Sequence, residues 1–450
     1  MNGGRCTGKG KRLRMLHWSE IDNLGILKKH RRYRGNPGGR KVLYADCVAA
    51  FDIESSTIYD ENGEPHSFMY IWMFALDDTV YYGRTWDEFK DFVFRLRDHL
   101  REGMTLLAYV HNLSYEYQFL SGIFDIDRED IFPTDPRKIL KLTLVPWLEL
   151  RCSYYLTNMS LRQFLKAEDV EMQKEELDYK KLRYPWTEMS EEELSYCNND
   201  VQGLTQAIRH RLKMTGDNLY TIPYTSTGYV RREAKRTLKT CRRHDDYRYD
   251  SWEVFKRLAK AFRGGNTHAN RYYAALGVIH EKGFSEDFAS CYPTEIVLDE
   301  REYPDRQFFV EPPELLAGDP IAHLEDLIST HRAVLFTVAL WDVKVDDDQP
   351  VPYLPMDKCD YVQRAGMDNG RILYAEKVEI TITDVDWQIV KGMYTWSRAE
   401  VTWLAYSGYR PLPEPYKDLV RTYFTRKTEL KGGDAYMYGR SKELLNSLYG

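Results

Sequence analysis

The sequence has no closely spaced cysteines and no long hydrophobic run. Its cysteines are scattered along the chain, at positions 6, 47, 152, 197, 241, 291 and 359, so neither a CxxC zinc site nor a disulfide framework is predicted. The longest apolar run, at 68–76, is far shorter than the roughly 20 residues that a membrane-spanning helix needs. No apolar stretch follows the N-terminal charges, as a secretory signal would require. We therefore expect a reduced, cytoplasmic protein with no membrane partner.

Internal repeats and low-complexity tracts are also lacking. The composition, 43% hydrophobic and 29% charged, is that of an ordinary globular protein. A chain of 450 residues is long for one domain, and we expect two or three, each with its own core.

Charge is unevenly distributed, although the net formal charge is only -6. Residues 1–41 contain twelve Lys and Arg against two acids, Glu20 and Asp22, so the remaining chain is strongly acidic. One interpretation of this segment is a solvated, disordered leader. The other is an arm that binds nucleic-acid phosphate.

Strand and helix signals alternate after the leader. We expect strands at 44–55, 66–76, 79–85 and 104–112, and helices at 86–103 and 113–124. This order is typical of the opening of a ribonuclease-H-like α/β domain, although other α/β folds can begin in the same way.

Later segments are dominated by helical signals. Ser190 and Glu193 form a capping box before an apolar stripe that predicts a helix of four turns. A linker and a basic helix are expected at 216–250, followed by a helix, a glycine step and a mixed α/β stretch to about 410, with a strand pair through 284–296. Two helices, at 413–431 and 434–449, are separated by the glycine-containing segment KGGD.

Carboxylates recur where three of these elements can meet. Asp52 and Glu54 share one face of a strand because strand side chains alternate. Glu116 begins a helix, and Tyr196 and Asp200 share a helical face at i and i+4. Four converging acids without His or Cys suit Mg²⁺ or Mn²⁺, and two such ions roughly 3.5–4 Å apart stabilise both the attacking and the leaving oxygen of a phosphodiester. Tyr196 would orient the attacking water. The alternative is that these acids are ordinary surface charges.

The segments FDIES, HNLSYEYQFL and YCNND resemble, in this order, the three exonuclease motifs of family B DNA polymerases. Their flanks are most similar to the protein-primed subfamily of phages and linear plasmids. Lys174 and Leu177 match the family's Lys-x-x-hydrophobic motif, which implies that Lys174 stabilises charge near the scissile phosphate. The resemblance further implies that five residues hold the single-stranded 3' end: Ser55, Asn112, Tyr115, Ser160 and Leu161. Glu116 departs from the family, whose second motif usually supplies Asp.

Two later segments resemble parts of the polymerase domain. Phe262-Arg263-Gly264-Gly265 is similar to a Tyr-x-Gly-Gly step, implying that Phe262, Gly264 and Gly265 contact DNA; a plain glycine turn is the alternative. DFASCYP resembles polymerase motif A, a strand ending in a turn. By that resemblance Asp287 binds the catalytic metals and Tyr292 packs under the incoming sugar. The alternative is a buried strand whose acid caps a turn.

The final residues, KELLNSLYG, resemble motif B of the fingers. The resemblance implies that Lys442 pairs with the triphosphate, that Asn446 and Tyr449 line the pocket of the new base pair, and that Gly450 allows close approach of the backbone. In the preceding helix Lys427 is the candidate for a second phosphate ligand, with a solvated basic face as the alternative.

The resemblance covers residues 44–450 and implies the N-terminal portion of the family's polymerase. The next motif, Tyr-x-Asp-Thr-Asp, does not occur, so we expect this chain to be competent as an exonuclease but not alone as a polymerase. The implied partners are single-stranded and primer-template DNA, deoxynucleoside triphosphates and a terminal priming protein, in the cytoplasm of a bacterial host. The alternatives are a non-catalytic DNA-binding remnant and a split-polymerase half that needs a C-terminal partner.

These expectations define a fold class and a set of domains. The fold class is α/β, a ribonuclease-H-like 3'-5' exonuclease domain followed by an incomplete family B palm and fingers. The expected domains are a leader at 1–41, the exonuclease at 42–215, a linker with a basic helix at 216–250, a partial palm with an insertion resembling a terminal-protein region at 251–410, and fingers helices at 411–450.

Overall fold

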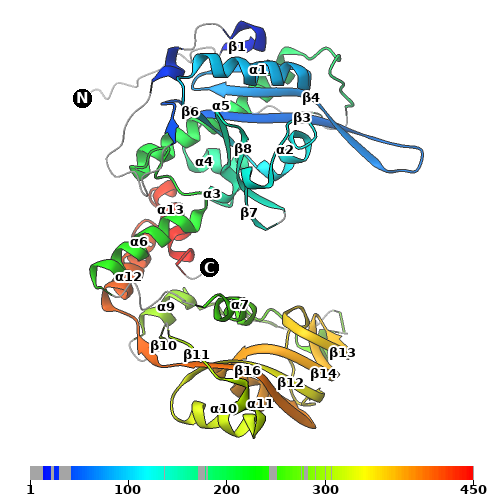
Figure 1. Ribbon diagram of the computed structural model, residues 1–450, viewed down its shortest axis with the longest axis vertical. Helices are drawn as coiled ribbons and strands as arrows, with labels where there is room; N and C mark the ends of the chain where they lie inside the picture. Colours follow the sequence, from blue (N-terminus) through cyan, green and yellow to red (C-terminus); the bar gives the residue numbers. More distant parts are fainter. Residues whose placement is uncertain are drawn as a thin grey trace. The chain divides into compact units, whose positions relative to one another are not determined.

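A computed structural model gives the structure of the protein, and it contains two compact units (Figure 1). Unit 1 comprises Met1–Arg232 and Tyr423–Leu448, and unit 2 comprises Glu233–Thr422. The structure describes residues 14–21, 25–29, 42–135, 137–170, 178, 181–242, 251–274, 276–277, 282–288, 290–298, 301–305 and 307–448. Each unit is described by itself. Among these residues no helix combines the length and apolar content that crossing a bilayer requires.

Unit 1 is built on a nine-stranded mixed sheet with the order β1-β5-β4-β3-β6-β9-β8-β7, in which β2 also pairs with β6. β3 runs antiparallel to β4 and parallel to β6. The strands are β1 (Arg14–His17), β2 (Leu43–Tyr44), β3 (Ala49–Tyr59), β4 (Pro65–Leu76), β5 (Thr79–Gly83), β6 (Met104–Val110), β7 (Ile131–Asp135), β8 (Lys138–Val145) and β9 (Leu148–Cys152).

Helices cover both faces of this sheet. α1 buries Phe89 and Phe92 against one face, together with Phe51 and Trp72, whereas α5 packs Val201 against the other. This two-sided cover explains why β4 is buried continuously from residue 69 to residue 76. The helices are α1 (Trp86–His99), α2 (Leu113–Leu120), α3 (Ser153–Thr157), α4 (Leu161–Ala167), α5 (Glu191–Thr215), α6 (Ser226–Thr240), α12 (Glu414–Glu429) and α13 (Ala435–Asn446), with α6 and α12 crossing the division between the units.

Unit 2 is built on a six-stranded antiparallel sheet with the order β11-β16-β12-β14-β13, in which β15 pairs with β12. α10 and α11 pack Leu324 and Trp387 against one face of this sheet, and α7 packs Val254 against Leu335 and Trp403 on the other. The elements are α7 (Trp252–Ala261), α8 (Arg271–Ala274), α9 (Cys291–Val297), β10 (Glu302–Pro304), β11 (Phe309–Val310), α10 (Pro320–Ser329), β12 (Ala333–Val345), β13 (Cys359–Asp368), β14 (Arg371–Thr383), α11 (Asp384–Met393), β15 (Tyr394–Thr395), β16 (Arg398–Ser407) and β17 (Tyr409–Pro411). β10 and β17 form a separate two-stranded ribbon.

Most of the expected elements are present, with ends that differ by a few residues. The capping box of Ser190 and Glu193 starts α5 as predicted, and the α1 helix ends at His99, four residues earlier than expected. The two final helices are α12 and α13. The domain boundaries expected from the sequence stay a prediction.

Two expectations need correction. The strand pair through residues 284–296 is wrong, because residues 282–288 belong to no strand and Cys291–Val297 is a helix. The segment finds no partner strand among the described residues of unit 2. A wholly disordered leader is also wrong for residues 14–21 and 25–29, since β1 pairs with β5 and Ile21 and Leu27 are buried.

Candidate functional site

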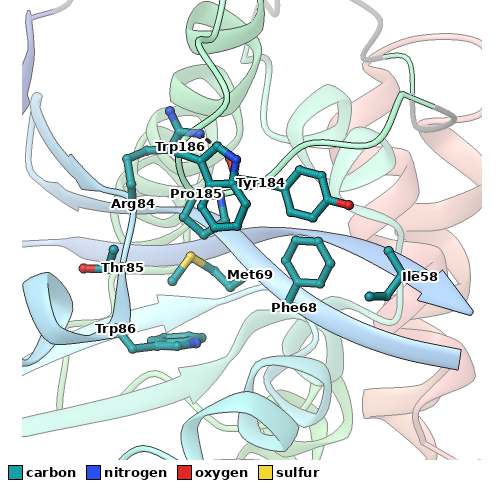
Figure 2. Close-up of a pocket in the computed structure, with 9 residues that line it drawn as sticks. All are labelled: Ile58, Phe68, Met69, Arg84, Thr85, Trp86, Tyr184, Pro185 and Trp186. Carbon is teal, nitrogen blue, oxygen red and sulfur yellow. Dashed lines mark hydrogen bonds between the residues drawn. The ribbon is translucent and has the colours of Figure 1, made fainter. Parts of the chain in front are cut away.

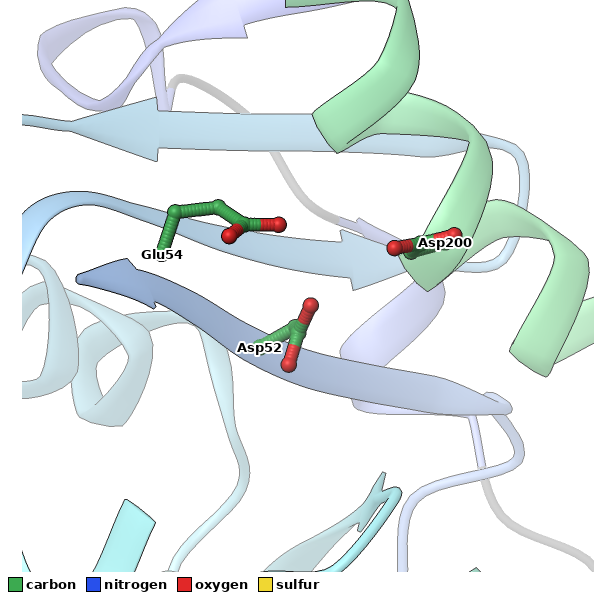
Figure 3. Close-up of side chains that lie close together, drawn as sticks. All are labelled: Asp52, Glu54 and Asp200. Carbon is green, nitrogen blue, oxygen red and sulfur yellow. The ribbon is translucent and has the colours of Figure 1, made fainter. Parts of the chain in front are cut away.

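Three carboxylates from distant segments meet on one face of the sheet of unit 1. Asp52 and Glu54 extend from β3 and Asp200 extends from α5, and one ligand oxygen from each lies within 4.8 Å of the others (Figure 3). The alternation of strand side chains gives Asp52 and Glu54 the same face. α5 lies across this face because its apolar residues, including Val201 and Leu204, pack into the core there.

A fourth carboxylate, Glu116, lies beside this cluster. It lies in the first turn of α2 and only 2% of it is exposed. Its side chain hydrogen-bonds to Asp52, while Oε2 has no hydrogen-bond partner among the described residues. A buried carboxylate oxygen without a partner is costly unless a proton or a cation satisfies it.

Burial and mutual repulsion raise the pKa values of these acids. Burial, followed by the charges of Glu116, Glu54 and Asp200, holds the pKa of Asp52 well above its usual range. Burial raises the pKa of Glu54 to about 8, with repulsion from Asp200 adding to it, and burial raises the pKa of Glu116 to about 8. For Asp200 burial raises the pKa to about 6, against a hydrogen bond from Tyr196 that lowers it. Without a counter-ion, these groups resist being ionised together.

This donor set fits a hard divalent cation. Asp52, Glu54 and Asp200 offer carboxylate oxygens within 4.8 Å of one another, and beside them Oε2 of Glu116 is buried with no hydrogen-bond partner in the described part of the chain. Mg²⁺ and Mn²⁺ prefer such oxygen ligands, and a bound cation compensates the repulsion that raises the pKa values. Asp52, Glu54 and Asp200 are therefore the residues that would hold it, with Glu116 beside them.

Arg183 also lies beside the cluster and is not among the site residues predicted from the sequence. Its side chain is almost fully buried, and its charge lowers the pKa of Glu54 against the larger effect of burial. Its guanidinium donates to Glu193 Oε1 from Nε at 3.0 Å and from Nη2 at 2.7 Å. No motif or periodic pattern marks Arg183, which stands between Leu182 and Tyr184 in the segment before α5.

Two of the predicted DNA-binding residues lie together at the edge of the cluster. The hydroxyl groups of Ser55 and Tyr115 hydrogen-bond to one another, which joins β3 to α2. Asn112 precedes α2 with φ 76 and ψ 53, and its side chain makes no capping hydrogen bond to the helix. Ser160, in contrast, caps α4 by accepting from the amide of Gln163, and Leu161 is half-buried.

The residues of unit 2 that resemble parts of a polymerase domain are exposed. Phe262 is 64% exposed and Gly264 and Gly265 follow it at the surface. Tyr292, in α9, is close to Gly265, since a Cβ at that glycine would lie 3.8 Å from the tyrosine hydroxyl. Asp287 is exposed and belongs to none of the potential metal clusters found among the described residues.

The predicted fingers residues lie at the end of unit 1. Lys442 and Asn446 are exposed on α13, and Lys427 Nζ lies 4.9 Å from the centre of the Phe424 ring. Three predicted site residues lie outside the described part of the chain: Lys174, Tyr449 and Gly450.

The sequence model of the family described as DNA polymerase type B, organellar and viral, matches residues 155–450. The chain belongs to this family of DNA polymerases. The matched region contains Tyr196, Asp200, Asp287 and Lys442, whereas Asp52 lies before it. No curated protein matches the chain.

Solved structures of a DNA polymerase share the fold. A structure described as phi29 DNA polymerase complexed with primer-template DNA aligns with a TM-score of 0.64 at 16% identity, covering 90% of this chain and 67% of that chain. A complex of the same polymerase with single-stranded DNA aligns with a TM-score of 0.62 at 16% identity and the same coverage. The resemblance to family B polymerases read from the sequence, and the α/β fold class, are confirmed.

Proposed function

We propose that the acid cluster is the metal-dependent 3'-5' exonuclease site of a family B DNA polymerase of the protein-primed type. The observation that carries this proposal is the meeting of Asp52, Glu54 and Asp200 within 4.8 Å, with Glu116 buried beside them. Surface charges on separate amphipathic elements have no reason to gather in this way, since like charges repel.

The residues around the cluster divide the work of hydrolysis. Two divalent ions, Mg²⁺ or Mn²⁺, would supply charge stabilisation at the attacking and leaving oxygens of the phosphodiester. Tyr196, held by its hydrogen bond to Asp200, orients the attacking water. The sugar and phosphate of the terminal nucleotide are held by the linked hydroxyls of Ser55 and Tyr115. The side-chain amide of Asn112, which makes no capping hydrogen bond to α2, holds them as well. Lys174 is proposed to stabilise charge near the scissile phosphate.

The remaining predicted residues are proposed to contact primer-template DNA and the incoming nucleotide. They are template contacts at Phe262, Gly264 and Gly265, metal and sugar contacts at Asp287 and Tyr292, and contacts to the triphosphate and the new base pair at Lys427, Lys442, Asn446, Tyr449 and Gly450. Ser160 and Leu161 are proposed to contact the single-stranded end. Deoxynucleoside triphosphates, DNA and a terminal priming protein are the proposed partners, in the cytoplasm of a bacterial host.

Degradation of a 5'-labelled single strand tests the proposal. With Mg²⁺ we expect a ladder of products shortened from the 3' end. With EDTA we expect no shortened products. Asp52→Asn and Glu54→Gln should each lower the rate at least about 100-fold, because losing a ligand costs several kcal/mol. Asp91→Asn, at an exposed acid on α1, is the matched control. Tight binding of DNA without turnover would favour the non-catalytic alternative.

A further inference from the structure

A stack of aromatic rings lies beyond the end of β5, at the edge of β4. The ring of Phe68 stacks on Tyr184 with centroids 5.3 Å apart and planes inclined by 11°. Tyr184 in turn stacks on Trp186 at 4.9 Å and 5°. With Ile58, Met69, Trp86 and others, these rings line a pocket of about 440 Å³ (Figure 2). We refer to Phe68, Tyr184 and Trp186 as the aromatic stack.

The aromatic stack is open to solvent, unlike a core cluster. Trp186 is 79% exposed, and Phe68 and Tyr184 are half-buried. Exposing an indole costs free energy that burial would recover, yet this ring lies at the end of an ordered stack with one face uncovered. A flat aromatic surface of this kind suits a planar ligand that stacks on it.

Strand register places the aromatic stack beside the acid cluster. Ser56 lies two residues after Glu54 on β3, just past a shift in the β3–β4 register between Glu54 and Ser55, and Phe68 on β4 is paired with Ser56. At roughly 3.3 Å per residue, Ser56 follows Glu54 by about 7 Å along the strand. The main-chain amide of Arg183 donates to Ser56 Oγ at 3.1 Å, which fixes the segment that carries Tyr184 and Trp186 at the same point.

A positive charge borders the same pocket. Arg84 lines it, and its guanidinium donates to the carbonyl oxygens of Tyr70, Tyr184 and Thr187 at 2.7–3.0 Å. These acceptors are uncharged, so the bonds themselves orient the guanidinium without neutralising it, while the negative charge of Glu88 also acts on Arg84. A cation beside stacked rings is the combination with which proteins bind single-stranded nucleic acid.

We propose that the aromatic stack binds a base of the single strand whose 3' end enters the acid cluster, and that Arg84 attracts the adjoining phosphate. The proposal rests on the proposed exonuclease function. It adds a binding position upstream of the scissile bond, at which a base stacks on Trp186. Because any base presents a flat face, this position accepts all sequences.

Binding without metal tests the proposal independently of cleavage. In EDTA, anisotropy of a labelled oligothymidylate should show that Trp186→Ala weakens binding about 10-fold, as expected for loss of one stacked base, whereas Trp186→Phe retains most of the affinity. Trp252→Ala is the matched control, since Trp252 is 66% exposed and also stacks on a neighbouring ring, that of Phe255. A series of oligonucleotides, each with a single abasic site one position further from the 3' end, locates the stacked base. At one position of the abasic site, wild type and Trp186→Ala should bind with equal affinity, because the base that stacks on Trp186 is then missing.

A small substrate separates failure of this proposal from failure of the proposed function. With Mg²⁺, hydrolysis of a thymidine 5'-monophosphate nitrophenyl ester, which is too short to reach the aromatic stack, should be unchanged in Trp186→Ala. If the wild-type protein does not hydrolyse the ester, the proposed exonuclease function is contradicted, but the binding result still stands. Equal oligonucleotide affinity of wild type and Trp186→Ala, or a difference that persists at every abasic position, would overturn the aromatic stack as a base-binding surface.

Discussion

The main-chain amide of Arg183 donates to the side-chain oxygen of Ser56 at 3.1 Å. This bond ties the segment before α5 to β3, and the guanidinium of Arg183 ties the same segment to Glu193 in the first turn of α5. The start of the helix that carries Tyr196 and Asp200 is thus fixed relative to the strand that carries Asp52 and Glu54.

The Glu193 contacts make part of the stability depend on pH. Burial raises the pKa of Glu193, but hydrogen bonds from Lys181, the Ser190 amide and Arg183 outweigh it and lower the pKa to about 2 from its ordinary value of 4.5. Since the pKa is lower in the folded state, Glu193 stabilises the fold fully above about pH 4.5, and this contribution is lost as the pH falls toward 2.

Glu193→Gln should therefore lower the free energy of unfolding most at neutral pH. The difference from wild type should shrink between about pH 4.5 and pH 2, as measured by urea unfolding at successive pH values. Glu192→Gln, at an exposed residue of the same turn, is the control, and its difference from wild type should be small throughout. A Glu193→Gln difference that stays constant over this range would contradict the assignment of these bonds.

A buried ion pair holds α5 to the chain after α4. Arg211 Nε donates to Glu168 Oε1 at 2.7 Å, both side chains are fully buried, and His210 Nδ1 lies 2.8 Å from Glu168 Oε2. Arg211→Met leaves the carboxylate buried without its main partner and should destabilise unit 1 by about 3–5 kcal/mol.

Arg209→Met is the matched control on the same helix. Arg209 pairs with Asp77 and Asp78 near the surface, so its loss should cost only about 1 kcal/mol or less. Chemical unfolding followed by circular dichroism measures both differences. Equal effects of the two substitutions would show that burial of the Glu168 pair has no special energetic role.

Tyr196→Phe separates positioning of water from binding of metal. The hydroxyl of Tyr196 hydrogen-bonds to Asp200 and, under the proposed function, orients the attacking water. Its removal should lower kcat for single-stranded DNA about 100-fold, since misplacement of a reacting group has effects of this size, while KM and the affinity for Mn²⁺ change little. A large loss of Mn²⁺ affinity together with unchanged kcat at saturating metal would assign Tyr196 to metal binding instead.

The elements that carry the acids could be predicted because local signals specify them. The apolar strand around Asp52 and the capping box at Ser190 are each contained within a few residues. The failed strand at 284–296 shows the limit of such signals, because a segment forms a strand only where another strand can pair with it.

Other parts of the site depend on contacts between distant segments. The aromatic stack brings together β4 and residues 184–186, and no local pattern indicates that these rings lie on one another. Arg183 likewise gains its role from Ser56 and Glu193. In the leader, Ile21 lies between two acids and Leu27 precedes two lysines, and only the tertiary fold shows that they complete the core next to α1.

Mn²⁺ binding followed by electron paramagnetic resonance tests the central claim most directly, because free and bound ions give different signals. Wild-type protein should bind Mn²⁺ saturably and release it on addition of Mg²⁺. Asp52→Asn and Asp200→Asn should each weaken this binding strongly, whereas Asp91→Asn should leave it unchanged. Equal Mn²⁺ binding by wild type, Asp52→Asn and Asp200→Asn would contradict the account, because the converging carboxylates would then not form a cation site.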